Sequence, residues 1–171
     1  MKERIPKSYF QNHDALFVAE NLIGKTLVRH FGNGKVFRSP IVETEAYIGP
    51  KDLACHASKG RTPRTEIMFG EGGKVYVYLI YGMYWMLNFV TGKTEEPQAV
   101  LIRGVKDCSG PGRLGKLLGL DKSFYGEDLE TSSRIWLEDS AHQGNTIATP
   151  RIGIDYSGEV WKEKPWRFLL N

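Results

Sequence analysis

Two β-strand patterns that lie close together in the sequence constrain the fold most. Residues 36–47 alternate in character, so Glu43, Glu45 and Tyr47 fall on one face of an extended strand. The run from Val75 to Val90 is rich in aromatic and β-branched residues and predicts a β-hairpin that turns near Gly82. The opposite face of the first strand carries Val42, Thr44 and Ala46.

The remaining patterns add helices and shorter strands. Asn12 or Asp14 can cap a helix over residues 13–22, and Gly24 can end it. A second helix is expected over 111–118, with Pro111 in its first turn, and 57–73 is expected to be a loop. Further strands are expected over 25–30, 99–105, 135–138, 146–154 and 167–170. Together these elements predict an α+β fold, a single domain over residues 1–171, with a mixed, mostly antiparallel curved sheet, a protruding β-hairpin and a few helices.

Composition limits the class of protein. With 171 residues, 41% of them hydrophobic, the chain can bury a core, and its net charge of +3 fits an acidic partner without proving one. Cys55 and Cys108 form no CxxC pair, so neither a disulfide framework nor a four-ligand zinc site is expected. No apolar run is long enough for a signal peptide or a membrane span, so we expect a cytoplasmic protein that does not enter a membrane.

Paired carboxylates are the first candidates for chemistry. Glu43 and Glu45 lie two residues apart on one strand face, beside the ring of Tyr47. One interpretation is that a carboxylate activates a water molecule; the other is an edge strand with a solvated, charged face. The pattern alone leaves both interpretations open.

A histidine follows this strand after a Gly-Pro turn. His56 is either a packed or surface histidine or part of a site, and its i, i+4 spacing from Asp52 allows both to contact one metal ion. A metal-dependent nuclease using Glu43, Glu45, Asp52 and His56 is therefore one alternative function. The ligand spacing matches no recognised metal site, so no metal is expected.

The hairpin carries several aromatic side chains. Most of them are expected to pack in the core, but Tyr81 sits beside Gly82 at the expected tip, where its own domain offers little to pack against. A ring at such a tip can wedge between stacked bases. A non-catalytic nucleic-acid-binding module with a stacking platform is thus the second alternative.

Two basic features remain ambiguous. Arg103 ends an apolar strand and is either solvated or buried and aimed at a phosphate or carboxylate. Residues 109–113, Ser-Gly-Pro-Gly-Arg, can hold a phosphate at a helix start or form a structural turn.

In this order, these residues resemble the alkyladenine (3-methyladenine) DNA glycosylase family over nearly the whole chain. The Glu-Thr-Glu-Ala-Tyr block that starts at Glu43 and the Tyr-Gly-Met-Tyr block that starts at Tyr81 are specific to it. The other matching blocks lie at 22–28, 41–56, 61–64, 68–69, 76–88, 109–111, 122–124, 151–153 and 164–168.

The resemblance implies a monofunctional glycosylase that flips alkylated or deaminated purines out of duplex DNA and hydrolyses the N-glycosidic bond, leaving an abasic site. By position Glu45 matches the general base, while Arg103 and the backbone carbonyl of Ile152 match groups that help to hold the attacking water. The resemblance further implies a monomer without cofactor or metal, associated with the nucleoid if the source is bacterial.

The same resemblance assigns the surroundings of the flipped base. Tyr81 matches the ring that fills the gap left in the base stack, and Asn88 matches the side chain that excludes guanine. The other matching pocket residues are Tyr47, His56 and Tyr78.

One departure from the family pattern concerns the segment after Arg103. Relatives carry a longer, partly helical insertion before the Ser-Gly-Pro turn, whereas only residues 104–108 separate the two here. We expect the chemistry to survive, while the DNA contacts or substrate range that the insertion provides are in doubt.

Overall fold

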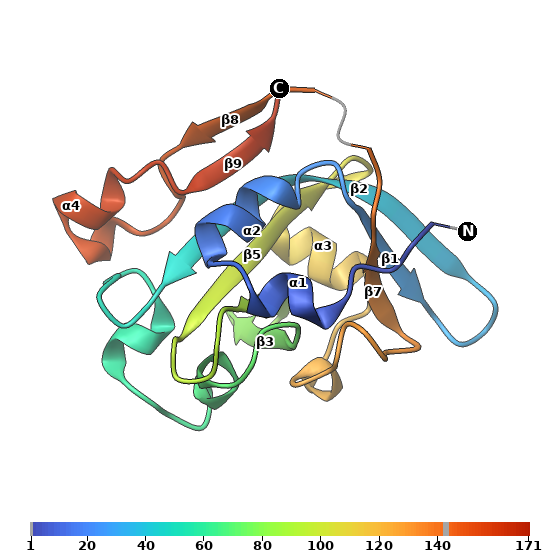
Figure 1. Cartoon of the computed structure of the whole chain (residues 1–171), viewed down its shortest axis with the longest axis horizontal. Helices are drawn as coiled ribbons and strands as arrows, with labels where there is room; N and C mark the ends of the chain where they lie inside the picture. The colour runs from blue at the N-terminus through green and yellow to red at the C-terminus, as the bar shows by residue number, and fades with distance from the viewer. Residues whose placement is uncertain (1, 142–143) are drawn as a thin grey trace.

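Antiparallel strands pair into one sheet in the computed structural model, which describes residues 2–141 and 144–171. The main path of the sheet runs β3-β4-β5-β2-β1-β7; β6 pairs with β5, and β9 lies between β2 and β8. The expected α+β class and mostly antiparallel sheet are confirmed. Figure 1 shows the strands, which span Thr26–His30 (β1), Val36–Ile48 (β2), Val75–Ile80 (β3), Tyr84–Thr91 (β4), Gln98–Val105 (β5), Cys108–Ser109 (β6), Ile135–Glu138 (β7), Thr146–Thr149 (β8) and Arg167–Leu170 (β9).

Strand β2 is the centre of this sheet. It pairs with β5 over its second half and with β1 over its first half, and β9 joins it at Glu43–Glu45. The register with β5 shifts on both sides of Glu43, as in a β-bulge, which bends a strand and re-aims its side chains. An edge strand with a solvated charged face, the alternative left open above, is therefore wrong.

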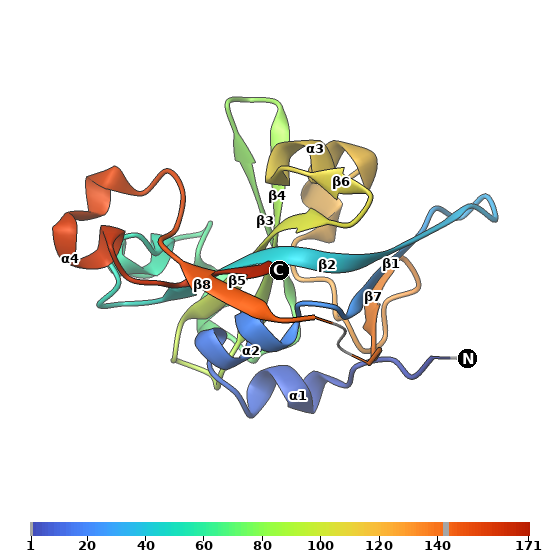
Figure 2. The same ribbon diagram turned by 90° about the horizontal axis from the view of Figure 1, so that it is seen from above.

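Helices cover both faces of the sheet. Figure 2 shows α1 and α2 on one side, and α3 with the tip of the β3–β4 hairpin on the other. Asp14 caps α2 by accepting a hydrogen bond from the backbone N–H of Phe17, as one of the two expected caps, and Pro111 opens α3. The helices span Lys7–Gln11 (α1), Ala15–Asn21 (α2), Pro111–Leu117 (α3) and Glu159–Lys162 (α4).

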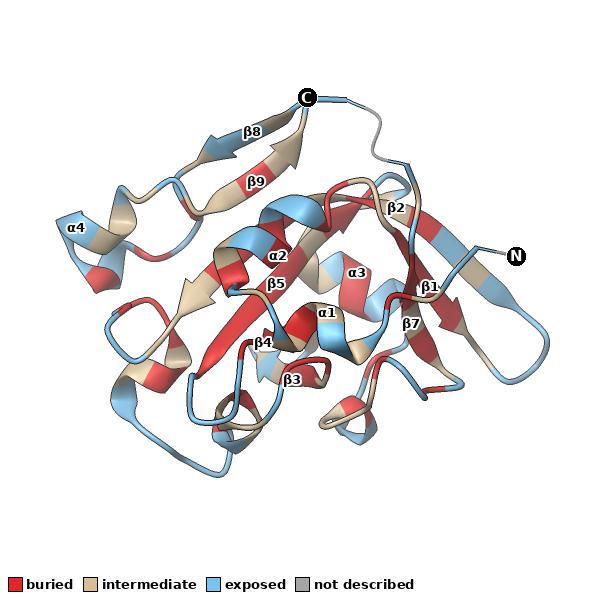
Figure 3. Cartoon of the chain, viewed as in Figure 1, coloured by how far each residue is buried: buried red, intermediate tan, exposed pale blue. Residues whose placement is uncertain are grey.

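The main core fills the space between these layers. Figure 3 shows β5 buried along nearly its whole length, and its inner residues Val100 and Ile102 are fully buried. On β2, Thr44 donates a hydrogen bond to the carbonyl of Ala19 in α2, and Ala46 is fully buried in the core. Glu43, Glu45 and Tyr47 consequently face the α3 side, as the alternation predicted.

The β3–β4 hairpin projects from the sheet. Tyr81 and Gly82 form its tip with left-handed φ values of 53° and 65°, and the side chain of Tyr81 is 84% exposed. The shortened connection after Arg103 forms a second, tight turn, because Gly104 pairs with Ser109 and Val105 with Cys108. The turn expected at Gly82 and the exposed position of Tyr81 are confirmed.

Several expectations need correction. The segment expected to be a strand over 146–154 ends at Thr149, since Pro150 has no N–H to donate to the ladder and Arg151 turns toward Asp52 instead. The expected loop over 57–73 contains two 3₁₀ helices, His56–Lys59 and Glu66–Phe69. Helices α1 and α4 and strand β6 were not predicted; each has only two to five residues, too few for a periodic pattern to emerge.

Candidate active site

A cleft of about 680 Å³ opens on the α3 side of the sheet, between the hairpin and the loop after β8. Its walls come from β2, β3, β4 and β5, from the 3₁₀ helix at His56, and from residues 109–113 at the start of α3. Seven of the residues singled out in the sequence line it together: Tyr47, His56, Tyr78, Tyr81, Asn88, Arg103 and Ile152.

Glu45 lies directly behind this wall. It is fully buried, Oε2 accepts a hydrogen bond of 2.7 Å from the backbone N–H of Ile152, and Oε1 accepts one of 2.7 Å from the hydroxyl of Tyr47. Burial raises the pKa of the Glu45 carboxyl, against the opposing effects of Arg103 and of these two donors. The site thus holds a carboxylate that is fixed in place and more basic than a solvated one.

Arg103 links the two carboxylates of β2. Its Nε donates to Glu43 Oε1 at 2.9 Å, and its Nη1 lies 3.7 Å from Glu45 Oε1. Arg167 of β9 holds the other oxygen of Glu43 at 2.7 Å. Of the two interpretations of Arg103, the structure supports the half-buried arginine aimed at a carboxylate, and Glu43 orients it.

A buried ion pair supports the loop that carries Ile152. The guanidinium of Arg151 binds both oxygens of Asp52, at 2.6 and 3.0 Å, and both side chains are fully buried. It also donates to the carbonyl of Ala46 at 3.0 Å and lies 4.8 Å from the centre of the Tyr47 ring. Sequence analysis missed Arg151 because its partner lies 99 residues away.

This arrangement changes the interpretation of Asp52. Both carboxylate oxygens of Asp52 bind Arg151, so Asp52 is engaged in an ion pair and does not serve as the metal ligand that the metal-dependent nuclease required. Over residues 2–141 and 144–171, no three His, Cys, Asp or Glu side chains lie close enough together to hold a metal ion.

His56 lines the cleft beside the tyrosines of β3. Its Nδ1 is 2.9 Å from the hydroxyl of Tyr76, and its ring packs edge-on against Tyr78 at 4.6 Å. Burial, then the nearby charges of Arg64 and Lys59, lower the pKa of His56 to about 4, so the imidazole is neutral at physiological pH. Tyr76 is itself buried in the core, as expected for most of the hairpin aromatics.

Asn88 is held rigidly at the base of the hairpin. It is 3% exposed, and its Nδ2 donates to the carbonyls of Tyr76 and Met86 at 3.2 and 3.4 Å. The amide nitrogen is therefore engaged with the backbone, and Oδ1 is the amide atom left for the cleft. Such a fixed acceptor can distinguish flat ligands by the groups on their edges.

Sequence similarity agrees with this geometry. The family model for methylpurine-DNA glycosylase matches residues 9–107 and 105–171, and the chain belongs to this family. A relative from Methanocella arvoryzae named "Putative 3-methyladenine DNA glycosylase" is 43% identical, with 96% of this chain and 90% of that protein covered. Relatives with the same name are 43% identical in Psychrobacter cryohalolentis, covering 86% of this chain and 87% of that protein, and 42% identical in Legionella pneumophila strain Corby, covering 98% and 94%.

The comparisons also locate the departure from the family pattern. The two matched segments meet and overlap at residues 105–107, which are the last residue of β5 and the turn to β6. The alignment with the Methanocella relative covers 184 positions, more than the 171 residues of this chain, so the chain lacks residues that the relative has. No helix of the described residues is long and apolar enough to cross a membrane.

Proposed function

We propose that this chain is a monofunctional DNA glycosylase that removes alkylated or deaminated purines from duplex DNA. The observation that carries the proposal is Glu45, a buried carboxylate fixed by two hydrogen bonds at the wall of a cleft lined with aromatic rings. Family membership and the names of the relatives support the same activity.

In the proposed reaction, the base first leaves the helix, because the glycosidic bond is hidden in a stacked duplex. Extrusion requires roughly a few kcal/mol for unstacking. Tyr81 stands exposed at the hairpin tip, and its ring would fill the vacated space and recover part of that free energy through stacking. The extruded purine would enter the cleft between the rings of Tyr47, His56 and Tyr78.

Glu45 would then act as the general base. Its carboxylate takes a proton from water as the water oxygen bonds to C1′ of the sugar, and the purine leaves with the electrons of the broken C1′–N bond. A carboxylate offers about four lone-pair sites, so water can bind to Glu45 beside the N–H of Ile152 and the hydroxyl of Tyr47. The negative charge also stabilises the cationic sugar in the transition state.

Glu45→Gln in single-turnover assays is the direct test. The wild-type protein, incubated in EDTA with duplexes that contain hypoxanthine or ethenoadenine, should release free base and give strand breaks only after alkali. The variant should lose excision by about 10²-fold or more, the usual contribution of a general base, while it still binds the duplex. Wild-type turnover by the variant would show that Glu45 is not the base, and duplex binding by the wild type without base release would instead favour a non-catalytic stacking module.

A further inference from the structure

The carboxylate of Glu43 is shared between two arginines. Arg103 Nε binds one of its oxygens at 2.9 Å, and Arg167 Nη2 binds the other at 2.7 Å. All three side chains are less than 20% exposed. Arg103 also approaches the proposed base, Glu45, but its Nη1 remains 3.7 Å from Oε1, beyond hydrogen-bond distance. The guanidinium of Arg103 thus lies between two carboxylates and is hydrogen-bonded to Glu43 alone.

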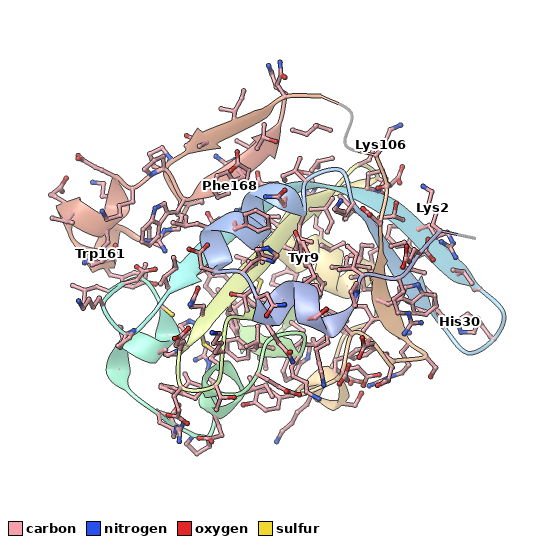
Figure 4. The ribbon with its side chains drawn as sticks, in the orientation of Figure 1. Lys2, Tyr9, His30, Lys106, Trp161 and Phe168 are labelled. Atoms are coloured by element: carbon pink, nitrogen blue, oxygen red, sulfur yellow. The ribbon has the colours of Figure 1, made fainter. Side chains whose placement is uncertain are left out.

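The strands around β2 impose this arrangement. The register between β2 and β5 skips Arg103, which has no partner residue opposite it and so lies in the bulge, where its side chain is re-aimed. On the other neighbouring strand, β9, Phe168 is buried in the main core near α2 (Figure 4). Alternation along β9 therefore turns Arg167 to the face that carries Glu43. Two strands that are distant in the sequence thus bring one arginine each to the same carboxylate.

Arg103 is the cation near Glu45 whose position depends on Glu43. The other nearby cation, Arg151 in the loop after β8, is already bound to both oxygens of Asp52. The remaining titratable groups that interact with Glu45 are hydroxyls of the cleft, and desolvation raises the pKa of each, so that they are neutral at physiological pH. These hydroxyls belong to Tyr47, Tyr78 and Tyr156.

We propose that Glu43 is a positioning residue for the reaction: by binding Arg103, it holds the guanidinium short of Glu45 and keeps that carboxylate able to take a proton. The inference rests on the proposed glycosylase function and adds a role that general-base catalysis alone does not assign. A movement of about 0.8 Å would bring Nη1 of Arg103 to ordinary hydrogen-bond distance from Glu45. Such an ion pair favours the charged form of a carboxylate and makes it a weaker base. Burial raises the pKa of Glu45, and Arg103 is the largest effect that opposes it.

Arg167 limits the effect of Glu43. It holds Oε2 of Glu43 and neutralises part of its charge, so Glu43 draws Arg103 less strongly than a free carboxylate would. The two residues therefore act on Glu45 in opposite directions. The negative charge of Glu43 favours a proton on Glu45, and the positive charge of Arg167 disfavours it.

The test is the pH dependence of single-turnover excision on a duplex that contains hypoxanthine, which stays neutral through the acidic range. Glu43→Gln keeps the shape of the side chain but removes its charge, so Arg103 is free to pair with Glu45. The acidic limb of the profile should then shift toward lower pH by roughly one unit, the effect of bringing a charge from 3.7 Å to hydrogen-bond distance at an effective dielectric constant of about 20. The rate above this limb should fall, because the base is weaker. Arg167→Gln should shift the limb the other way, toward higher pH.

Glu127→Gln is the matched control. Glu127 has a similar exposure, 19%, and is held by Arg134 at 2.6 Å, but neither residue lines the cleft. The acidic limb of this variant should coincide with that of the wild type.

A purely structural role for Glu43 would lower the rate at every pH and leave the acidic limb in place. That outcome would overturn the inference while the glycosylase function stands. If Glu43→Gln does not fold, the shift in Arg167→Gln decides: a limb at higher pH supports the inference, and an unmoved limb overturns it. Failure of the wild type to release hypoxanthine or any other damaged base would overturn the proposed function and the inference together.

Discussion

The buried ion pair between Asp52 and Arg151 offers the strongest test of how this site is held together. Asp52→Asn removes the negative charge but keeps the shape, and leaves a fully buried guanidinium whose contacts with Asp52, at 2.6 and 3.0 Å, lose their charge partner. Breaking one partner of a buried pair typically destabilises a protein by about 3–5 kcal/mol, because the remaining charge is uncompensated. For a chain of this size, each kcal/mol lowers Tm by roughly 2–4 °C, so the variant should melt about 6–20 °C below the wild type.

Asp155→Asn provides the matched control. Asp155 also pairs with a cation, Lys162, but at 3.9 Å and with 90% of its side chain exposed. Exposed pairs contribute roughly 0–1 kcal/mol, so its melting temperature should change little. Chemical unfolding of both variants and of the wild type at one pH measures how much each substitution lowers the free energy of unfolding.

The same substitution should affect activity. Arg151 precedes Ile152, whose N–H holds Glu45 Oε2, so loosening the pair should misplace the carboxylate and lower the single-turnover rate even at temperatures where the variant is folded. The reasoning is refuted if Asp52→Asn lowers the free energy of unfolding by less than 1 kcal/mol and the variant keeps the wild-type excision rate. In that case the pair neither supports the fold nor positions the site.

Further predictions concern the hairpin, the carboxylate and α3. Tyr81→Ala should weaken binding to lesion-containing duplex by roughly 1–3 kcal/mol, the value of one stacked ring, with an unchanged melting temperature because the side chain is 84% exposed; a titration and a melt check both. Excision should increase with pH through the raised pKa of Glu45, and rates that stay flat across the acidic range would argue against this base. Glu45→Gln should melt above the wild type at neutral pH, and the gain should shrink as pH falls toward the ordinary carboxyl pKa; a variant less stable at pH 7.5 would contradict this. Gly115→Ala should destabilise by roughly 1–3 kcal/mol in urea unfolding despite its better helix propensity, because an added Cβ would lie 2.0 Å from the Trp85 carbonyl oxygen.

The sequence predicted the sheet better than its small connecting elements. Period-2 alternation on β2 placed Glu43, Glu45 and Tyr47 on one face, and the structure confirms this, since alternation follows from strand geometry alone. Alternation could not show that β2 is central, because β5 and β9, which pair with it, come from distant parts of the chain. Strand neighbours depend on long-range packing that a local pattern does not contain.

In the candidate site, likewise, the residues could be predicted from the sequence but the contacts between them could not. All the assigned residues except Arg103 lie in matching blocks of the sequence, and the structure brings all of them, Arg103 included, to one cleft or to the wall behind it. The interactions that hold them were not visible, because Asp52 and Arg151 lie 99 residues apart and Arg167 reaches Glu43 across 124.

The energetics of Glu45 explain why so many donors surround it. A fully buried carboxylate is unfavourable without compensation, and Arg103, the Ile152 N–H and Tyr47 each lower the pKa of this group. Burial still outweighs them, so the folded state holds the proton more tightly than the unfolded state and stability falls as pH rises through the raised pKa. A general base works best when its pKa lies near the working pH, so the burial that destabilises the fold also improves the proposed base. Stronger neutralisation of Glu45, for example by a closer contact with Arg103, would stabilise the protein but lower the pKa and weaken the base.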